Sequence, residues 1–191
     1  MSQPQQQLQD LKQRMLKDET LPLKETATNL VFGEGSVNPK VYFLGEAPGR
    51  FEDLSGRPFI GQAGKLLEKL LTEIGLTREE VYITSILRYR PPQNRDPKPD
   101  EIESFRPYLD EEIAIIKPKI IATLGRFSLN KFLPDSKISQ VHGIPHPITF
   151  NGLNTIVLPL YHPAAALRRR EFFNVLQKDF FTLKQLIDSD L

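Results

Sequence analysis

The sequence predicts an α/β fold, a three-layer αβα sandwich around a central sheet of four mostly parallel strands. Four apolar runs of strand length occur along the chain, and helix-like amphipathic stretches separate them. The runs are Val41–Leu44, Val81–Leu87, Ile120–Leu124 and Thr155–Leu160. They are continuous rather than alternating, as is typical of strands buried on both faces of a parallel sheet.

Three longer helices are predicted by apolar side chains that recur every three or four residues. They span residues 63–74, 102–116 and 173–187, and Gly75 suits the C-cap of the first. A short amphipathic helix is expected near the N-terminus, after a Gln-rich start that we expect to fray. Its apolar positions are Leu8, Leu11, Met15 and Leu16.

Length and composition indicate one globular domain. The chain has 191 residues and 39% hydrophobic content, which suits a single core. We expect residues 21–191 to form that domain and residues 1–20 to be an N-terminal extension with a short helix. The start of the chain lacks the pattern of a signal peptide, and no apolar run is as long as a membrane span. We therefore expect a cytoplasmic protein that does not bind membranes, and we separately expect it to be a monomer.

Cysteine content and charge narrow the possible chemistry. The sequence contains no cysteine, which excludes disulfides, thiol nucleophiles and cysteine-bound zinc or iron–sulfur clusters. The formal net charge is only +1, so any binding of nucleic acid must depend on a local basic patch.

Two titratable side chains follow predicted strands directly. Glu46 lies in the turn Gly45–Gly49, and His162 follows the last predicted strand. Ligands of open α/β sheets bind beyond the carboxyl ends of the strands, so we expect these two turns to meet at one edge. A carboxylate and an imidazole together suit a reaction that needs an activated water and a stabilised anionic leaving group.

Several short blocks stand in a fixed order along the chain. They are Val31–Gly35, Gly45–Gly49, Gly56–Gly61, Val81–Thr84, Arg90–Pro92, Leu124–Gly125 and Tyr161–Pro163. In this order the blocks resemble the uracil-DNA glycosylase superfamily, specifically its family 4, the iron–sulfur type of bacteria and archaea. The resemblance runs from about Leu21 to Leu186. It implies a four-stranded parallel sheet between helices, with a DNA groove at the strand ends.

The resemblance also implies a reaction, the hydrolysis of the bond between uracil and the sugar in DNA during base-excision repair. The base first leaves the stack and enters a pocket. Glu46 would position and activate the attacking water, and His162 would donate a hydrogen bond to the departing base. Phe59 would stack on the base, the Ala47 backbone would contact it, and Glu52 would orient the loop or touch the base. The implied base-binding positions are Gly45, Ala47, Glu52, Phe59 and Ser85.

Contacts to the DNA backbone are expected from arginines on two loops. Leu167 and Arg168 follow the His162 motif and would fill the gap that the flipped base leaves in the duplex. Arg169, Arg90 and Arg95 would contact phosphates. Arg88 and Lys98 are interpreted in the same way.

The first departure from the family pattern concerns the four cysteines that hold a four-iron, four-sulfur cluster. The matching positions here are Asp18, Leu21, Tyr89 and Phe105, and none of these side chains is a thiol. We therefore expect no cluster and no other cofactor or metal. Apolar packing by Leu21, Tyr89 and Phe105, worth about 1.5–3 kcal/mol each, would hold the same segments together if these side chains touch.

The second departure is Ser85, at a position where the family usually has an asparagine. A hydroxyl is shorter than an amide and rotates, so one hydrogen bond to the base, worth about 1–3 kcal/mol, is lost. The substrate could therefore be uracil or another deaminated base, such as hypoxanthine or xanthine. A non-catalytic module that binds damaged DNA is a third reading. Covalent trapping on DNA through a loop histidine is disfavoured, because residues 88–95 contain none.

Overall fold

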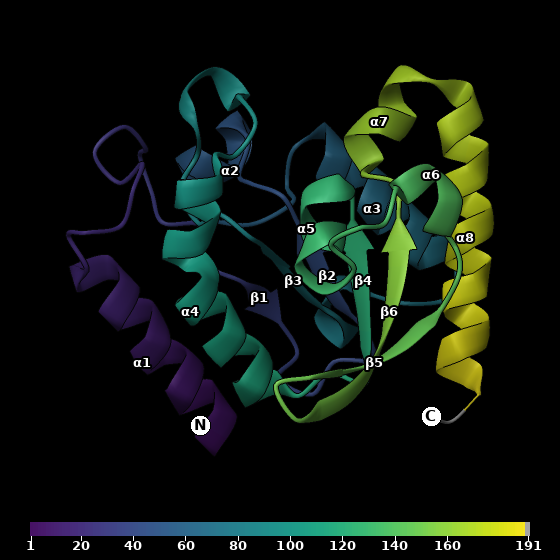
Figure 1. Cartoon of the computed structure of the whole chain (residues 1–191), viewed down its shortest axis with the longest axis horizontal. Helices are drawn as coiled ribbons and strands as arrows, with labels where there is room; N and C mark the ends of the chain where they lie inside the picture. Colours follow the sequence, from purple (N-terminus) through teal and green to yellow (C-terminus); the bar gives the residue numbers. More distant parts are fainter. Residues whose placement is uncertain (190–191) are drawn as a thin grey trace.

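The computed structural model, which describes residues 1–189, contains a mixed six-stranded sheet between two layers of helices (Figure 1). The strand order is β1-β3-β2-β4-β6-β5. The four central strands are mutually parallel: β3 (Tyr82–Ser85), β2 (Tyr42–Gly45), β4 (Ile120–Leu124) and β6 (Leu153–Leu160). The α/β class and the four parallel strands are thus confirmed, whereas the expected total of four strands is wrong.

The two additional strands are antiparallel and lie at the edges of the sheet. β1 (Glu34–Gly35) pairs with β3, and β5 (His146–Phe150) pairs with β6. β1 has only two residues, and β5 alternates between half-buried and exposed positions and contains Pro147. Neither strand contains the continuous apolar run that marks a strand buried on both faces, so sequence patterning passes over them.

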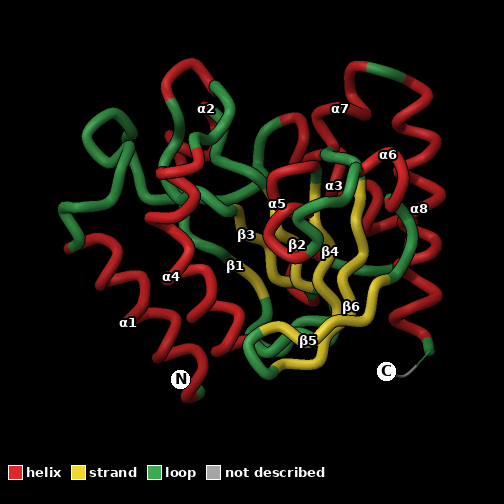
Figure 2. The backbone as a smooth tube through the Cα atoms, in the orientation of Figure 1, coloured by secondary structure: helices red, strands yellow, loops and turns green. Residues whose placement is uncertain are grey.

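Helices cover both faces of the sheet (Figure 2). One face packs against α3 (Gln62–Glu73), α7 (Pro163–Arg168) and α8 (Arg170–Asp188). The other packs against α1 (Gln3–Lys17), α4 (Pro99–Ile116) and α5 (Arg126–Phe132). Two short helices, α2 (Arg50–Ser55) and α6 (Ile138–Val141), lie in connections. No helix within residues 1–189 is long and apolar enough to cross a membrane.

The N-terminal segment is more ordered than its composition predicts. Helix α1 begins at Gln3, because Ser2 and Gln5 form a reciprocal capping box. The expected fraying of the Gln-rich start is therefore wrong. Leu11 and Met15 are fully buried, and α1 packs along α4.

The central strands have continuously apolar sequences because both of their faces are buried. In β2 and the residue before it, Val41 and Phe43 face the core beneath α3 and α8, whereas Tyr42 and Leu44 face the core beneath α1 and α4. All four side chains are fully buried. Each strand therefore contributes to two cores, and its last residue delivers the chain to the same edge of the sheet.

A buried ionic cluster joins α4 to the sheet. The Arg88 guanidinium lies 2.8 Å from the Glu112 carboxylate, which also accepts hydrogen bonds from the hydroxyls of Tyr42 and Tyr82 at 2.6 and 3.1 Å. Arg88 is 1% exposed and Glu112 is fully buried. The expectation that Arg88 contacts phosphate is therefore wrong, because its charge is neutralised inside the protein.

Candidate active site

A pocket of about 260 Å³ opens at the carboxyl ends of the parallel strands. Its walls come from the turns after β2, β3 and β6, from the segment before α3 and from α7. Eight residues singled out from the sequence line it or its rim: Glu46, Ala47, Glu52, Phe59, Ser85, Arg95, His162 and Arg168. Residues separated by more than a hundred positions in sequence thus share one cavity, as the strand-end argument predicts.

Glu46 follows β2 and is half-buried in the pocket wall. Burial raises the pKa of its carboxyl above the ordinary value, and the nearby Asp96 carboxylate raises this pKa further. Arg126 opposes the shift. The result is a carboxylate whose negative charge is poorly solvated, which makes it a better proton acceptor than an exposed glutamate.

His162 is the N-cap residue of α7. Its Nδ1 accepts a hydrogen bond of 3.1 Å from the backbone N–H of Ala164, so the ring proton of the neutral form must be on Nε2. Burial lowers the pKa of His162 to about 4, although Glu52 acts in the opposite direction. At neutral pH the residue is therefore an uncharged donor with a fixed tautomer.

Phe59 lies between the end of β2 and His162. Its ring centroid is 5.7 Å from that of His162, and a methyl group at Gly45 would lie only 2.6 Å from the Phe59 ring. Phe59 adopts a left-handed φ of 50°, and Arg78 donates a hydrogen bond of 3.0 Å to its carbonyl. A methyl group at Gly64 would lie 1.9 Å from that carbonyl oxygen. Arg78 therefore holds an otherwise unfavourable backbone conformation, while Gly64 leaves room for the Phe59 carbonyl and Gly45 leaves room for its ring.

Glu52 lies on α2 and links this helix to the segment that leads into α3. Its Oε1 accepts hydrogen bonds from the backbone N–H groups of Ile60 and Gly61 at 2.9 and 2.7 Å. Gly61 is the N-cap of α3. The Glu52 carboxylate thus lies at the helix N-terminus, where the helix dipole favours negative charge, and it fixes the segment that contains Phe59.

Comparison with known proteins identifies the family. The model of the family described as Uracil DNA glycosylase superfamily matches residues 32–183. The chain belongs to the uracil-DNA glycosylase superfamily.

Individual relatives resemble almost the whole chain. The Type-4 uracil-DNA glycosylase of Sulfurisphaera tokodaii is 43% identical over 185 residues, which cover 94% of this chain and 84% of that protein. The Type-4 enzyme of Archaeoglobus fulgidus is 42% identical over 184 residues, 94% of this chain and 92% of that protein. That of Saccharolobus solfataricus is 44% identical over 167 residues, covering 84% and 77%. The resemblance found in the sequence motifs is therefore confirmed.

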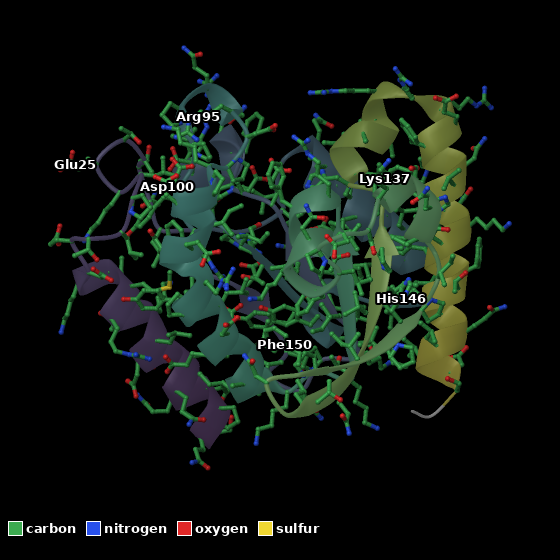
Figure 3. The ribbon with its side chains drawn as sticks, in the orientation of Figure 1. Glu25, Arg95, Asp100, Lys137, His146 and Phe150 are labelled. Carbon is green, nitrogen blue, oxygen red and sulfur yellow. The ribbon has the colours of Figure 1, made fainter. Side chains whose placement is uncertain are left out.

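The arginines of this glycosylase-superfamily domain differ in their availability. Arg168 and Arg169 are exposed at the end of α7, beside the exposed Leu167, and Arg168 borders the pocket. Arg95 also borders the pocket and lies at the same end of the molecule as α2 (Figure 3), but it is paired with the buried Glu101. The Arg90 Nε donates a hydrogen bond of 2.7 Å to Asn94. The structure therefore groups Arg95 and Arg168 around one opening.

Sequence reasoning missed an ion pair close to Glu46. Arg126, the first residue of α5 after β4, pairs with Asp96 from the loop between β3 and α4. Both act on the pKa of Glu46. Arg126 could have been found from the sequence, because it follows a predicted strand as Glu46 and His162 do. Asp96 could only be placed by the path of its loop.

The positions that match cluster cysteines in family 4 do not suit an iron–sulfur cluster. Leu21, Tyr89 and Phe105 are buried in one apolar core, and the rings of Tyr89 and Phe105 are 6.2 Å apart. Asp18 accepts a hydrogen bond of 2.6 Å from the Tyr108 hydroxyl. None of the four side chains is a thiol, and three of them belong to one apolar core, so these positions fit packing rather than a metal site.

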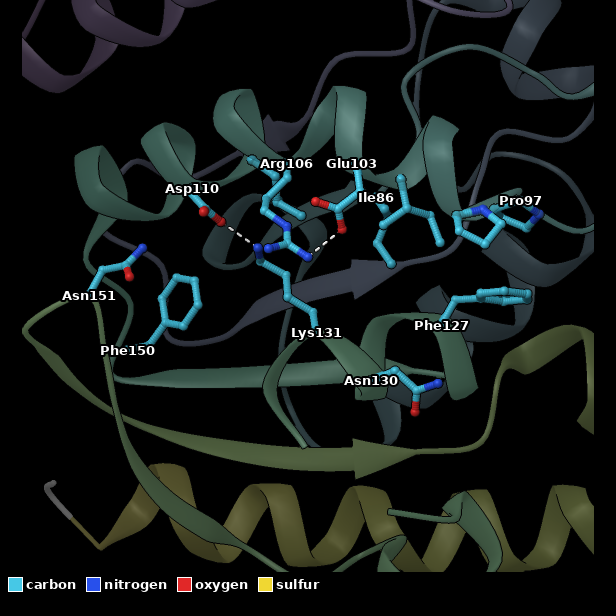
Figure 4. A pocket seen from close by; sticks show the side chains of 13 residues that line it. Ile86, Pro97, Glu103, Arg106, Asp110, Phe127, Asn130, Lys131, Phe150 and Asn151 are labelled. Atoms are coloured by element: carbon cyan, nitrogen blue, oxygen red, sulfur yellow. Dashed lines mark hydrogen bonds and ion pairs between the residues drawn. The ribbon is translucent and has the colours of Figure 1, made fainter. Parts of the chain in front are cut away.

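A second cavity, of about 490 Å³, lies between α4, α5 and the β5–β6 turn (Figure 4). It contains neither Glu46 nor His162. Its charged side chains neutralise one another, because Lys131 pairs with Asp110 and Arg106 pairs with Glu103. The lining of this cavity contains no histidine, and its carboxylates are paired with basic side chains. It therefore lacks the combination of carboxylate and imidazole found in the first pocket.

Proposed function

We propose that this chain is a uracil-DNA glycosylase, a hydrolase that cleaves the N-glycosidic bond of uracil in DNA. The observation that carries the proposal is the single pocket that contains Glu46, Phe59 and His162 at the strand ends. Membership of the uracil-DNA glycosylase superfamily supports it, as does the similarity to enzymes named Type-4 uracil-DNA glycosylase.

Glu46 is assigned to the attacking water. The transition state carries positive charge on the sugar and negative charge on the departing base. An ionised, poorly solvated carboxylate accepts a proton from the water and also favours the positive sugar. The raised pKa of Glu46 suits the first of these tasks.

His162 is assigned to the departing base. Its Nε2–H can donate a hydrogen bond to the base oxygen that becomes negative, while Ala164 holds the ring through Nδ1. Because the pKa of His162 is lowered to about 4, the donor is a neutral imidazole. It stabilises the departing anion by a hydrogen bond and does not itself carry a positive charge.

Base recognition is assigned to the walls of the pocket. Phe59 would stack on the base, and the Ala47 backbone and the Ser85 hydroxyl would bind its polar edge. Gly45 leaves room for the Phe59 ring, and Glu52 acts by orienting the loop that bears Phe59. On the DNA side, Arg90, Arg95, Arg168 and Arg169 would bind phosphates, and Leu167 would fill the vacated space.

Alkali-induced strand cleavage of oligonucleotides that carry uracil, hypoxanthine or xanthine tests this function. We expect the wild-type protein to release uracil, and Ser85→Asn to release it about 10-fold faster by regaining one hydrogen bond. If the wild type prefers a purine lesion and Ser85→Asn gains nothing on uracil, the substrate is that purine lesion rather than uracil. The assignment as a glycosylase would still stand. If no lesion is cleaved, the remaining interpretation is a non-catalytic module that binds damaged DNA.

We also propose that the protein acts without the iron–sulfur cluster of family 4. The packed side chains of Leu21, Tyr89 and Phe105 support this, since they occupy the core where thiolates would be needed. Purified protein should be colourless, and metal analysis should find no stoichiometric iron. Brown protein with several irons per chain would contradict the proposal.

A further inference from the structure

Exposed apolar side chains are sequence neighbours of residues that line the pocket, since Phe51 precedes Glu52 and Leu167 precedes Arg168. Seven large apolar side chains in the described part of the chain are exposed, and three of them lie on α2 and α7. They are Phe51, Leu54 and Leu167, which are 59%, 57% and 52% exposed. Figure 1 shows α2 and α7 at the same end of the molecule. Single exposed apolar residues are common on proteins, so their position beside the pocket carries the argument.

Phe51 lies next to the wall of the pocket. Its neighbour Glu52 lines the pocket and binds the backbone N–H of Gly61. A methyl group at Gly61 would lie 3.2 Å from Oε1 of Glu52 and 3.4 Å from Cδ2 of Phe51. The carboxylate and the phenyl ring therefore flank the same stretch of backbone, the carboxylate in the pocket and the ring largely in solvent. Leu54, three residues further along α2, lies on the same face of the helix.

We propose that Phe51 is a stacking platform for an unpaired base next to the flipped nucleotide, so that the α2 side of the pocket binds single-stranded DNA. The inference rests on the proposed function. Aromatic side chains bind single strands by stacking on bases, irrespective of sequence. A base beside a flipped uracil has lost one stacking partner, and the exposed ring at the pocket replaces it. In a duplex the same base remains paired and stays within its helix.

The test is binding of a single-stranded oligonucleotide with 2-aminopurine beside a 2′-fluorinated deoxyuridine, whose glycosidic bond resists hydrolysis. Phe51→Ser should bind about 10-fold more weakly than the wild type and should no longer quench the 2-aminopurine fluorescence. Phe51→Trp should retain both properties. The matched control is Phe181→Ser on α8, where the ring is 52% exposed, and it should behave like the wild type.

Three results would overturn the proposal: unchanged affinity and quenching in Phe51→Ser, an equal loss in Phe181→Ser, or an equal loss on duplex DNA. Uracil excision from an ordinary oligonucleotide is measured in parallel. A wild type that quenches 2-aminopurine through Phe51 but releases no uracil would overturn the proposed function and leave the stacking contact. A wild type that releases uracil without that quenching would overturn the stacking contact alone.

Discussion

Burial acts on Glu46 and His162 in opposite directions on the pKa scale, and both shifts suit the proposed chemistry. It raises the pKa of the carboxyl and lowers that of the imidazole, since each charged form loses solvation. The pocket then combines a carboxyl group that binds a proton more tightly than an exposed glutamate with an imidazole that is neutral near pH 7. Two residues in one pocket thereby have different roles, a proton acceptor and an uncharged hydrogen-bond donor.

Replacing Glu46 with glutamine should separate activity from stability. We expect uracil excision to fall by at least about 100-fold, because the amide cannot accept a proton from water. A raised folded-state pKa means that ionised Glu46 opposes folding above that pKa and that this penalty disappears at lower pH. The melting temperature of Glu46→Gln should therefore equal or exceed that of the wild type at pH 7. A lower melting temperature would contradict this account.

The pH dependence of excision should report Glu46 alone. The rate should fall as pH decreases through the raised pKa of Glu46, and His162 should add no inflection between pH 5 and 8 because its pKa is about 4. His162→Ala should be slower by about 100-fold at every pH in that range. Single-turnover rates across the range provide the measurement. A second inflection that disappears in His162→Ala would show that a charged imidazole is required.

Helix α4 provides the clearest example of an element whose role depends on its neighbours. Its Glu112 carboxylate binds Arg88 and the hydroxyls of Tyr42 and Tyr82, and so connects α4 to β2 and β3. These strands deliver Glu46 and Ser85 to the pocket. The buried cluster therefore contributes to the placement of the site without facing it.

Arg88→Met should destabilise the fold and leave the chemistry of folded molecules intact. Removing one partner of a buried ion pair leaves the other charge uncompensated, at a cost of about 3–5 kcal/mol. The control is Arg14→Met, which removes an exposed pair with Glu111 and should cost less than about 1 kcal/mol. Urea denaturation gives both values. Equal costs for the two variants would mean that Glu112 does not depend on Arg88.

At the scale of the whole molecule, the near-zero net charge makes the distribution of arginines decisive. The formal charge is +1, yet Arg95 and Arg168 border the pocket. Arg168 forms no ion pair within residues 1–189, whereas Arg95 is paired with Glu101 and, at the second cavity, Arg106 is paired with Glu103. Attraction to DNA should therefore be concentrated at the end of the molecule that contains α2 and α7.

Salt titrations of DNA binding should identify the arginines that meet phosphates. Arg168→Ala and Arg169→Ala should each reduce the slope of log affinity against log salt by about one, as expected for the loss of one phosphate contact. Arg106→Ala, at the second cavity, is the control and should leave the slope unchanged. If Arg168→Ala, Arg169→Ala, Arg90→Ala and Arg95→Ala all keep the wild-type slope, the DNA lies elsewhere.

The sequence by itself determined the four central strands, the longer helices and the positions of Glu46 and His162 at strand ends. These features follow from local patterns, namely continuous apolar runs, helical periodicity and short motifs. The proximity of Glu46 and His162 could be predicted from the sequence, because parallel strands end at one edge of the sheet.

Only the tertiary structure decided the edge strands, the burial of Arg88, the tautomer of His162 and the pairing of Asp96 with Arg126. β5 needs β6 to satisfy its backbone, and Arg88 is buried because Glu112, 24 residues away, neutralises it. The protonation of His162 depends on one N–H group and on the solvent that the surrounding chain excludes. Such properties arise from contacts between distant segments and from loss of solvent, neither of which is encoded in the pattern of any single segment.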